Sequence, residues 1–180
     1  RTLSLIAFAQ AWTSIQDDPQ KNKLLIIDSD LEAPGLTLIQ GNLNETAFSY
    51  LDLLTLIQDN NSIEEIVSTA EALMGTLTLP IETSQQRVEH FFLPTYRYEQ
   101  QLFDLYASPR NKEYILAEVL SSLAAQLGAS AVLVDLRAGI SEYSAPLLLD
   151  PRVKKYCVTS TSLQSIMGTK QVLNFISKGL

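Results

Sequence analysis

Residues 24–30, Leu-Leu-Ile-Ile-Asp-Ser-Asp, decide how this chain folds. Four consecutive apolar residues are typical of a parallel strand that is buried on both faces. A second run, residues 131–135 (Ala-Val-Leu-Val-Asp), has the same form and also ends in an aspartate. Ligands of open α/β sheets bind at the carboxyl ends of the strands, so the sequence predicts a site that contains Asp28, Asp30 and Asp135.

The rest of the chain predicts helices that alternate with strands. Ser62 and Glu65 predict a capping box at the start of one helix, and Ala33-Pro34-Gly35 predicts a turn. This alternation favours an α/β fold, with a three-layer, doubly wound, mostly parallel sheet and helices on both faces. Helices are expected at 2–16, 46–58, 62–74, 111–127, 144–149 and 161–177, and further strands at 76–80 and 155–159.

Residues 82–108 show no clear periodicity. They carry an aromatic cluster, and we expect a helical or aromatic surface insertion there; the cluster consists of Phe91, Phe92, Tyr96 and Tyr98. A length of 180 residues fits one domain. The chain begins with Arg1 rather than Met, in a segment of helical character, so we expect residues 1–180 to be an incomplete single domain.

Composition narrows the classes of function. The formal net charge is −7, from 13 Lys and Arg against 20 Asp and Glu, which argues weakly against binding DNA through phosphate contacts. No apolar stretch reaches the roughly 20 residues of a membrane span. The single Cys157 excludes an internal disulfide and favours a reducing, cytoplasmic setting; we expect it in the core. The single His90 has no partner ligands, which favours a surface or packing residue over a metal ligand.

The aspartates suit phosphoryl transfer from a nucleotide. That reaction requires groups that cradle the phosphates, hold Mg²⁺ and orient the attacking water. A hydroxyl at a helix start can bind Mg²⁺, and the helix N-terminus attracts phosphate. The chain offers Thr2 at a helix start, Asp135 at one strand end, and Asp28 and Asp30 at another.

The order of these motifs resembles a known family. Arg1-Thr2 opens a helix, residues 24–37 read LLIIDSDLEAPGLT, and residues 131–141 read AVLVDLRAGIS. Together they resemble the MinD/ParA group of P-loop ATPases, the deviant Walker A branch of the SIMIBI class. In that family a Gly-rich loop ending in Lys-(Ser/Thr) opens a helix, an Asp-x-Asp strand end follows, and an Asp-x-x-x-Gly strand end comes later. The resemblance runs from residue 1 to about 177, with residues 41–128 matched only by element order.

The resemblance implies a role for each motif residue. Arg1 stands at the position of the phosphate-binding lysine, and Thr2 at that of the Mg²⁺ ligand. Asp30 would orient the attacking water, with Asp28 supporting the metal. Asp135 would be the carboxylate that holds the metal-bound water.

Other positions depart from the family pattern. Gly139 would lie in the second switch, near the γ-phosphate, but Arg137 stands where small residues or proline are usual. The Gly-rich loop, the first strand and the family's second lysine are not in this chain, and the segments that bind adenine after the last helix are not in it either. The resemblance therefore implies the middle of a nucleotide-binding domain.

Three functions remain open. The first is a MgATP-binding, slowly hydrolysing switch ATPase, with ATP and ADP and Mg²⁺ as cofactors. Its resemblance implies an ATP-dependent homodimer, stimulated by a protein partner, that positions or partitions cargo. The second is a non-hydrolysing nucleotide-sensing or protein-interaction module on the same fold. The third is an aspartate-nucleophile phosphatase with Asp28-x-Asp30, which Glu32 makes less favourable.

Overall fold

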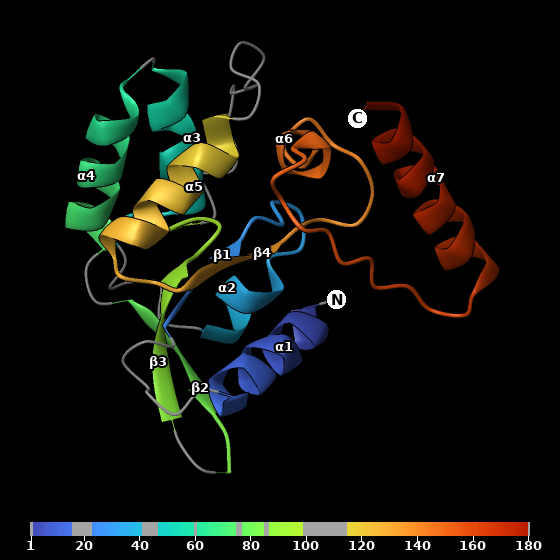
Figure 1. Ribbon diagram of the computed structural model, residues 1–180, viewed down its shortest axis with the longest axis horizontal. Helices are drawn as coiled ribbons and strands as arrows, with labels where there is room; N and C mark the ends of the chain where they lie inside the picture. The colour runs from blue at the N-terminus through green and yellow to red at the C-terminus, as the bar shows by residue number, and fades with distance from the viewer. Residues whose placement is uncertain are drawn as a thin grey trace.

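The computed structural model describes residues 2–15, 23–40, 47–59, 61–74, 77–84, 87–98 and 115–179. Its core is a four-stranded sheet in the order β2-β3-β1-β4, in which β1 pairs in parallel with β3 and β4 and only β2 is antiparallel (Figure 1). The expected α/β class with a mostly parallel sheet is therefore confirmed. The strands are β1 (Leu24–Asp28), β2 (Thr78–Glu82), β3 (Arg87–Leu93) and β4 (Ala131–Asp135).

Helices pack on both faces of the sheet because the side chains of a strand alternate between its two faces. One face of β1 contributes Leu24 and Ile26, which pack with Ala9 and Leu36. Those two partners belong to α1 (Thr2–Ile15) and α2 (Gly35–Gln40). All five residues of β1 are buried, as the uninterrupted apolar run predicted.

The opposite face of the sheet carries the larger core. Leu25 and Ile27 pack there with residues of three helices, α3 (Tyr50–Gln58), α4 (Ile63–Met74) and α5 (Ile115–Gln126). The predicted capping box of α4 is confirmed, since Ser62 N donates to Glu65 Oε2 (2.9 Å) and Glu65 N donates to Ser62 Oγ (3.2 Å). These reciprocal bonds satisfy amides that a helix start leaves without intrahelical partners.

Several predicted boundaries differ from the structure. The turn expected at Ala33-Pro34-Gly35 leads directly into α2, a helix that the sequence did not indicate. Residues 47–49 precede α3 rather than belong to it, and β2 begins at Thr78 instead of residue 76. The residues before Ile115 in the helix expected from residue 111 lie outside the described ranges.

The segment in which we expected an insertion supplies strand β3. Phe92 is buried in this strand, and residues Phe91 to Leu93 pair with Leu25 to Ile27 of β1. Tyr96 is buried beyond the strand end, whereas Tyr98 is exposed. Phe92 and Tyr96 therefore belong to the core and Phe91 packs against it, while residues 99–108 lie outside the described ranges.

The strand predicted at Lys155–Thr159 is wrong. The segment runs without regular secondary structure, and the side chain of Tyr156 is 64% exposed. A strand needs a neighbour to accept and donate its backbone hydrogen bonds, and no strand of the described ranges pairs with this segment. Cys157 is exposed, so its predicted place in the core is also wrong.

Two helices complete the chain, α6 (Ala145–Leu149) and α7 (Leu163–Gly179). α6 buries Leu147 and Leu148, whereas α7 buries no side chain and stands apart from the sheet (Figure 1). Among the described helices, none combines the length and apolar character needed to cross a membrane.

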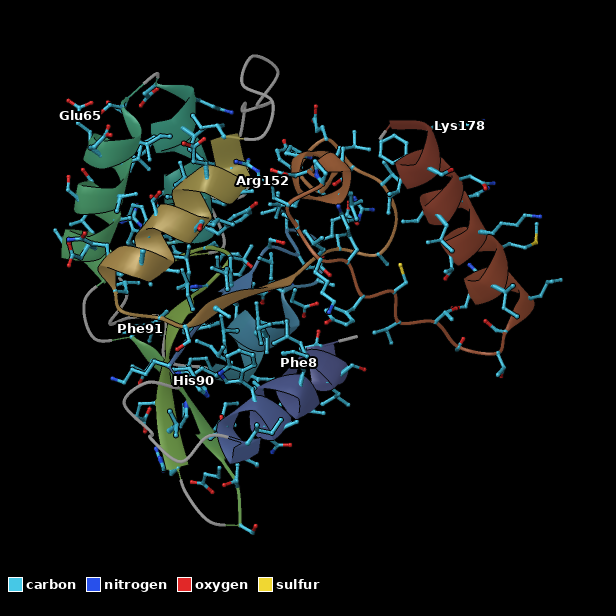
Figure 2. The ribbon with its side chains drawn as sticks, viewed as in Figure 1. Phe8, Glu65, His90, Phe91, Arg152 and Lys178 are labelled. Carbon is cyan, nitrogen blue, oxygen red and sulfur yellow. The ribbon has the colours of Figure 1, made fainter. Side chains whose placement is uncertain are left out.

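His90 joins β3 to α1 and β1 inside the core (Figure 2). Leu24 N donates to His90 Nδ1 (3.1 Å), so the ring hydrogen is on Nε2, which lies 3.0 Å from Thr13 Oγ1. Thr13 Oγ1 in turn donates to Ala9 O (2.8 Å). Burial, and to a smaller extent the charge of Lys23, lower the pKa of His90 to about 4. His90 is thus a packing residue, as the sequence indicated.

This environment predicts a pH-dependent stability. The folded protein holds His90 neutral, while the unfolded chain protonates it below about 6.5, so stability is lost as pH falls from 6.5 towards 4. Relative to His90→Gln, the parent should lose about 2 kcal/mol of unfolding free energy between pH 7 and pH 5. Urea unfolding at both pH values measures this difference. Because His90 is the only histidine, an equal loss in both proteins would contradict the assignment.

Candidate functional site

The carboxyl ends of three parallel strands meet at one edge of the sheet. Asp28 and Asp135 occupy opposite positions in the β1–β4 pairing. Ser29 ties the two ends together, because its backbone N (3.1 Å) and its Oγ (2.9 Å) both donate to the Asp135 carbonyl oxygen. Thr95, just beyond β3, donates from Oγ1 to the Asp28 carbonyl oxygen at 2.9 Å. Hydrogen bonds thus fix this edge before any ligand binds.

Two helices begin at the same edge. Thr2 Oγ1, at the start of α1, donates to Asp135 Oδ2 at 2.6 Å. Gly35, at the start of α2, lies so close to Thr2 that a Cβ at residue 35 would be 2.9 Å from Thr2 Oγ1. A side chain at residue 35 would therefore have to displace Thr2 where these two helix starts approach each other.

Asp28 is fully buried at this edge. Its Oδ2 accepts a hydrogen bond from Thr37 N (2.8 Å) and its Oδ1 one from Asp30 N (3.3 Å). Burial raises the pKa of Asp28 above its usual value, the Asp135 charge adds to the rise, and the Thr37 and Asp30 hydrogen bonds oppose it. A cation placed beside Asp28 would favour its ionised form.

Asp30 organises the loop that follows β1. Its Oδ1 accepts from Glu32 N (3.3 Å) and from Ala33 N (3.1 Å), and the residue is almost fully buried. Asp commonly stabilises turns through such bonds to its own following backbone. In this conformation the carboxylate is engaged within the loop.

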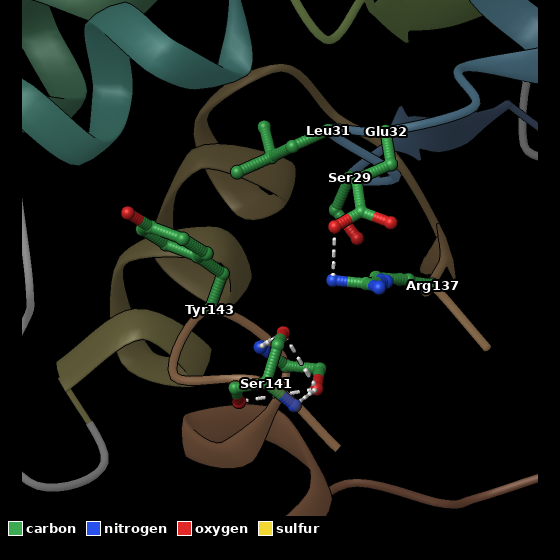
Figure 3. Close-up of a pocket in the computed structure, with 7 residues that line it drawn as sticks. Ser29, Leu31, Glu32, Arg137, Ser141 and Tyr143 are labelled. Atoms are coloured by element: carbon green, nitrogen blue, oxygen red, sulfur yellow. Dashed lines mark hydrogen bonds and ion pairs between the residues drawn. The ribbon is translucent and has the colours of Figure 1, made fainter. Parts of the chain in front are cut away.

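The loop after β4 lies opposite the loop after β1. Arg137 Nη1 pairs with Glu32 Oε1 at 2.5 Å, and Figure 3 shows the two side chains facing each other. Gly139 has a φ of 92°, in the region that favours glycine, and it is exposed. A pocket of about 230 Å³ lies between the loops; its lining residues are Ser29, Leu31, Glu32, Arg137, Ser141, Tyr143 and Ser144.

Several pocket residues were not singled out from the sequence. Ser141 and Ser144 bind each other, since Ser141 N donates to Ser144 Oγ (2.9 Å) and Ser144 N donates to Ser141 Oγ (3.1 Å). The pattern Ser-x-x-Ser before the apolar run of α6 is the signal that would have indicated this turn. Tyr143 carried no comparable signal.

The structure brings four of the predicted site residues to one edge and places a fifth, Gly139, on the neighbouring loop. Thr2, Asp28, Asp30 and Asp135 lie at the strand and helix ends described above. Gly139 lies on the exposed loop beyond Arg137. Arg1 lies outside the described residues, so its expected role at the phosphates stays a prediction.

The side-chain oxygens at this edge are suited to a magnesium ion that binds together with a phosphate-bearing ligand. Within the described ranges, no group of three or more His, Cys, Asp or Glu side chains is arranged to hold a metal by itself. Mg²⁺, however, prefers oxygen donors, keeps several waters, and commonly takes one or two protein groups together with substrate phosphates. The Thr2 hydroxyl and the Asp135 and Asp28 carboxylates are donors of this kind.

Comparisons with protein-family models, with curated proteins and with solved structures found no match to this chain. The function is therefore inferred from the residues of this chain, and the family resemblance of its motifs stays a prediction.

The close approach of Gly35 to Thr2 gives a stability prediction. Gly35→Ala should destabilise the protein by about 1–3 kcal/mol, because the new methyl group displaces Thr2 from Asp135. Gly168→Ala is the matched control, since a Cβ there meets nothing within 4 Å on exposed α7; it should be neutral or stabilise by up to about 1 kcal/mol. Thermal or urea unfolding compares the two. Equal effects on stability would show that Gly35 is not required at this contact.

Proposed function

We propose that this chain belongs to a MgATP-dependent switch ATPase of the MinD/ParA type. The hydrogen bond from Thr2 Oγ1 to Asp135 Oδ2 is the observation that carries the proposal. It joins a hydroxyl at a helix start to a carboxylate at a strand end, the pairing that P-loop nucleotide hydrolases use for Mg²⁺. Asp28 and Asp30 lie at the end of the neighbouring strand.

The arrangement of the sheet supports the same proposal. β1 is an inner strand with parallel neighbours on both sides, and helices pack on both of its faces. We infer a doubly wound, P-loop-like domain in which nucleotide binds at the carboxyl edge of β1 and β4. The antiparallel β2 is the outer strand beside β3.

Each residue of the edge then has a role. Thr2 would bind Mg²⁺ directly, while Asp135 and Asp28 would accept hydrogen bonds from its waters. When bound, the ion would neutralise charge on the β- and γ-phosphates. Asp30 would orient the attacking water, and to do so it would leave the amides of Glu32 and Ala33. This exchange would couple the conformation of the loop to the state of the nucleotide.

Binding and hydrolysis of ATP would change which proteins this protein binds, rather than convert a metabolite. ATP would promote a homodimer, and a protein partner would stimulate slow hydrolysis that releases it. Cargo positioning or partitioning is the expected use. The net charge of −7 gives no support for direct DNA binding by this segment.

One observation favours a second candidate, a nucleotide-sensing module that does not hydrolyse its ligand. Asp30 is buried and its carboxylate is engaged by the backbone of its own loop. If that arrangement persists with nucleotide bound, no carboxylate from this loop orients a water. The two candidates differ in turnover, not in nucleotide binding.

Loss of Asp30 separates these candidates. Asp30→Ala should keep MgATP binding within a few-fold and slow hydrolysis by about 100-fold or more. Asp30→Asn, which preserves shape, should slow hydrolysis similarly. The matched control is Asp59→Ala, an exposed aspartate at the end of α3, which should leave turnover unchanged. Turnover independent of Asp30 would remove its role, and binding without any turnover would favour the sensing module.

The magnesium role of Thr2 has its own test. Titration calorimetry with ATP, in Mg²⁺ and in EDTA, should show tighter binding with Mg²⁺ in the parent and little difference in Thr2→Ala. Thr2→Ser keeps the hydroxyl and should preserve the Mg²⁺ dependence. Equal ATP affinities of the parent in Mg²⁺ and in EDTA would contradict a magnesium site at Thr2.

A further inference from the structure

The ion pair between Arg137 and Glu32 links the two loops that leave the candidate site. Arg137 lies two residues beyond Asp135, and Glu32 lies two residues beyond Asp30. The backbone of Glu32 is itself held by Asp30 Oδ1 (3.3 Å). A movement of Asp135 or of Asp30 is therefore transmitted to the ion pair through a short stretch of backbone.

The ion pair is weak enough for another anion to replace Glu32 as the partner of Arg137. Its side chains are 40% (Arg137) and 62% (Glu32) exposed. Ion pairs between solvent-exposed side chains stabilise a protein little, because water screens the charges and both side chains lose freedom. A phosphate offers a guanidinium several charged oxygens and a two-bond contact, which is stronger. Arg137 can thus leave Glu32 for a phosphate at small cost.

The surroundings of Arg137 suit an anionic group. Among the residues that line the pocket, Arg137 is the only cation, and the hydroxyl-bearing side chains beside it come from Ser29, Ser141, Tyr143 and Ser144. Ser29 also binds the Asp135 carbonyl oxygen, so the pocket adjoins the strand ends directly. The Asp28 and Asp135 carboxylates at the strand ends repel phosphate, and the positive charge of Arg137, two residues beyond Asp135, offsets part of this repulsion.

We propose that Arg137 recognises the terminal phosphate of a nucleoside triphosphate, and that Glu32 is the internal anion that this phosphate displaces. The inference rests on the proposed function, and it adds the residue by which the site distinguishes triphosphate from diphosphate. Breaking the pair removes the side-chain contact between the two loops, while the Ser29 hydrogen bonds to the Asp135 carbonyl oxygen keep the strand ends together. Binding of the triphosphate thereby changes the surface that both loops form.

The test measures dissociation constants for a non-hydrolysable ATP analogue and for ADP, both with Mg²⁺. Arg137→Gln should weaken binding of the analogue about tenfold or more and leave ADP within about twofold. Glu32→Gln should tighten binding of the analogue by about two- to fivefold, because the competing anion is removed. In the double variant the Glu32→Gln gain should vanish, since it acts only through Arg137.

Arg87→Gln is the matched control. Arg87 is also an exposed arginine in ion pairs, with Glu82 and Glu89, but it lies at the opposite end of β3 from the site. It should change neither constant, and thermal unfolding checks that all variants are folded. Equal losses for both nucleotides, or no loss, in Arg137→Gln would overturn this inference alone. A parent that binds neither nucleotide would overturn the proposed function and the inference together.

Discussion

The hydrogen bond between Thr2 Oγ1 and Asp135 Oδ2 spans 133 residues of sequence, and the candidate site depends on it. It forms only because β1 and β4 pair in the register that sets Asp28 opposite Asp135. A shift of one residue in that register would turn every side chain of a strand to the other face. The apolar side chains of β1, packed against helices on both faces, resist such a shift. Packing of the core thus determines the geometry of the polar edge.

The buried carboxylates at the carboxyl edge of the sheet lower the stability of the fold. Asp28, Asp30 and Asp135 are all buried, and burial of carboxylates is costly unless hydrogen bonds or cations compensate. Hydrogen bonds from Thr37, Ala33 and Thr2 provide part of that compensation. Burial still raises the pKa of Asp28, so the hydrogen bonds to its carboxylate offset only part of the cost of burying its charge. Sites that depart from the rules of a stable core are commonly functional, which is why this edge is the place to seek a ligand.

The sequence predicted elements whose signals are local. The apolar runs of β1 and β4 and the capping pair Ser62 and Glu65 are confirmed, because each depends on neighbouring residues. β3 could not be recognised, since a buried histidine interrupts its apolar pattern and its partners lie elsewhere in the chain. The strand predicted at 155–159 is wrong for the opposite reason: its composition suits a strand, but no other strand pairs with it in the described ranges. At the site, the aspartates were predictable as strand ends, whereas the Glu32–Arg137 contact depends on how the two loops face each other.

The central claim is that the ends of β1 and β4 and the start of α1 bind a metal–nucleotide complex. Nuclear magnetic resonance of the labelled protein with MnATP tests it most directly, because the paramagnetic ion broadens signals of nearby amides. The account predicts that the amides of Ser29, Asp30 and Leu136 broaden first, while those of Glu82 and Arg87, at the far end of the sheet, stay sharp. MgATP should shift the same signals without broadening them. Broadening spread evenly over the protein, or confined to the Glu82–Arg87 end, would contradict the claim.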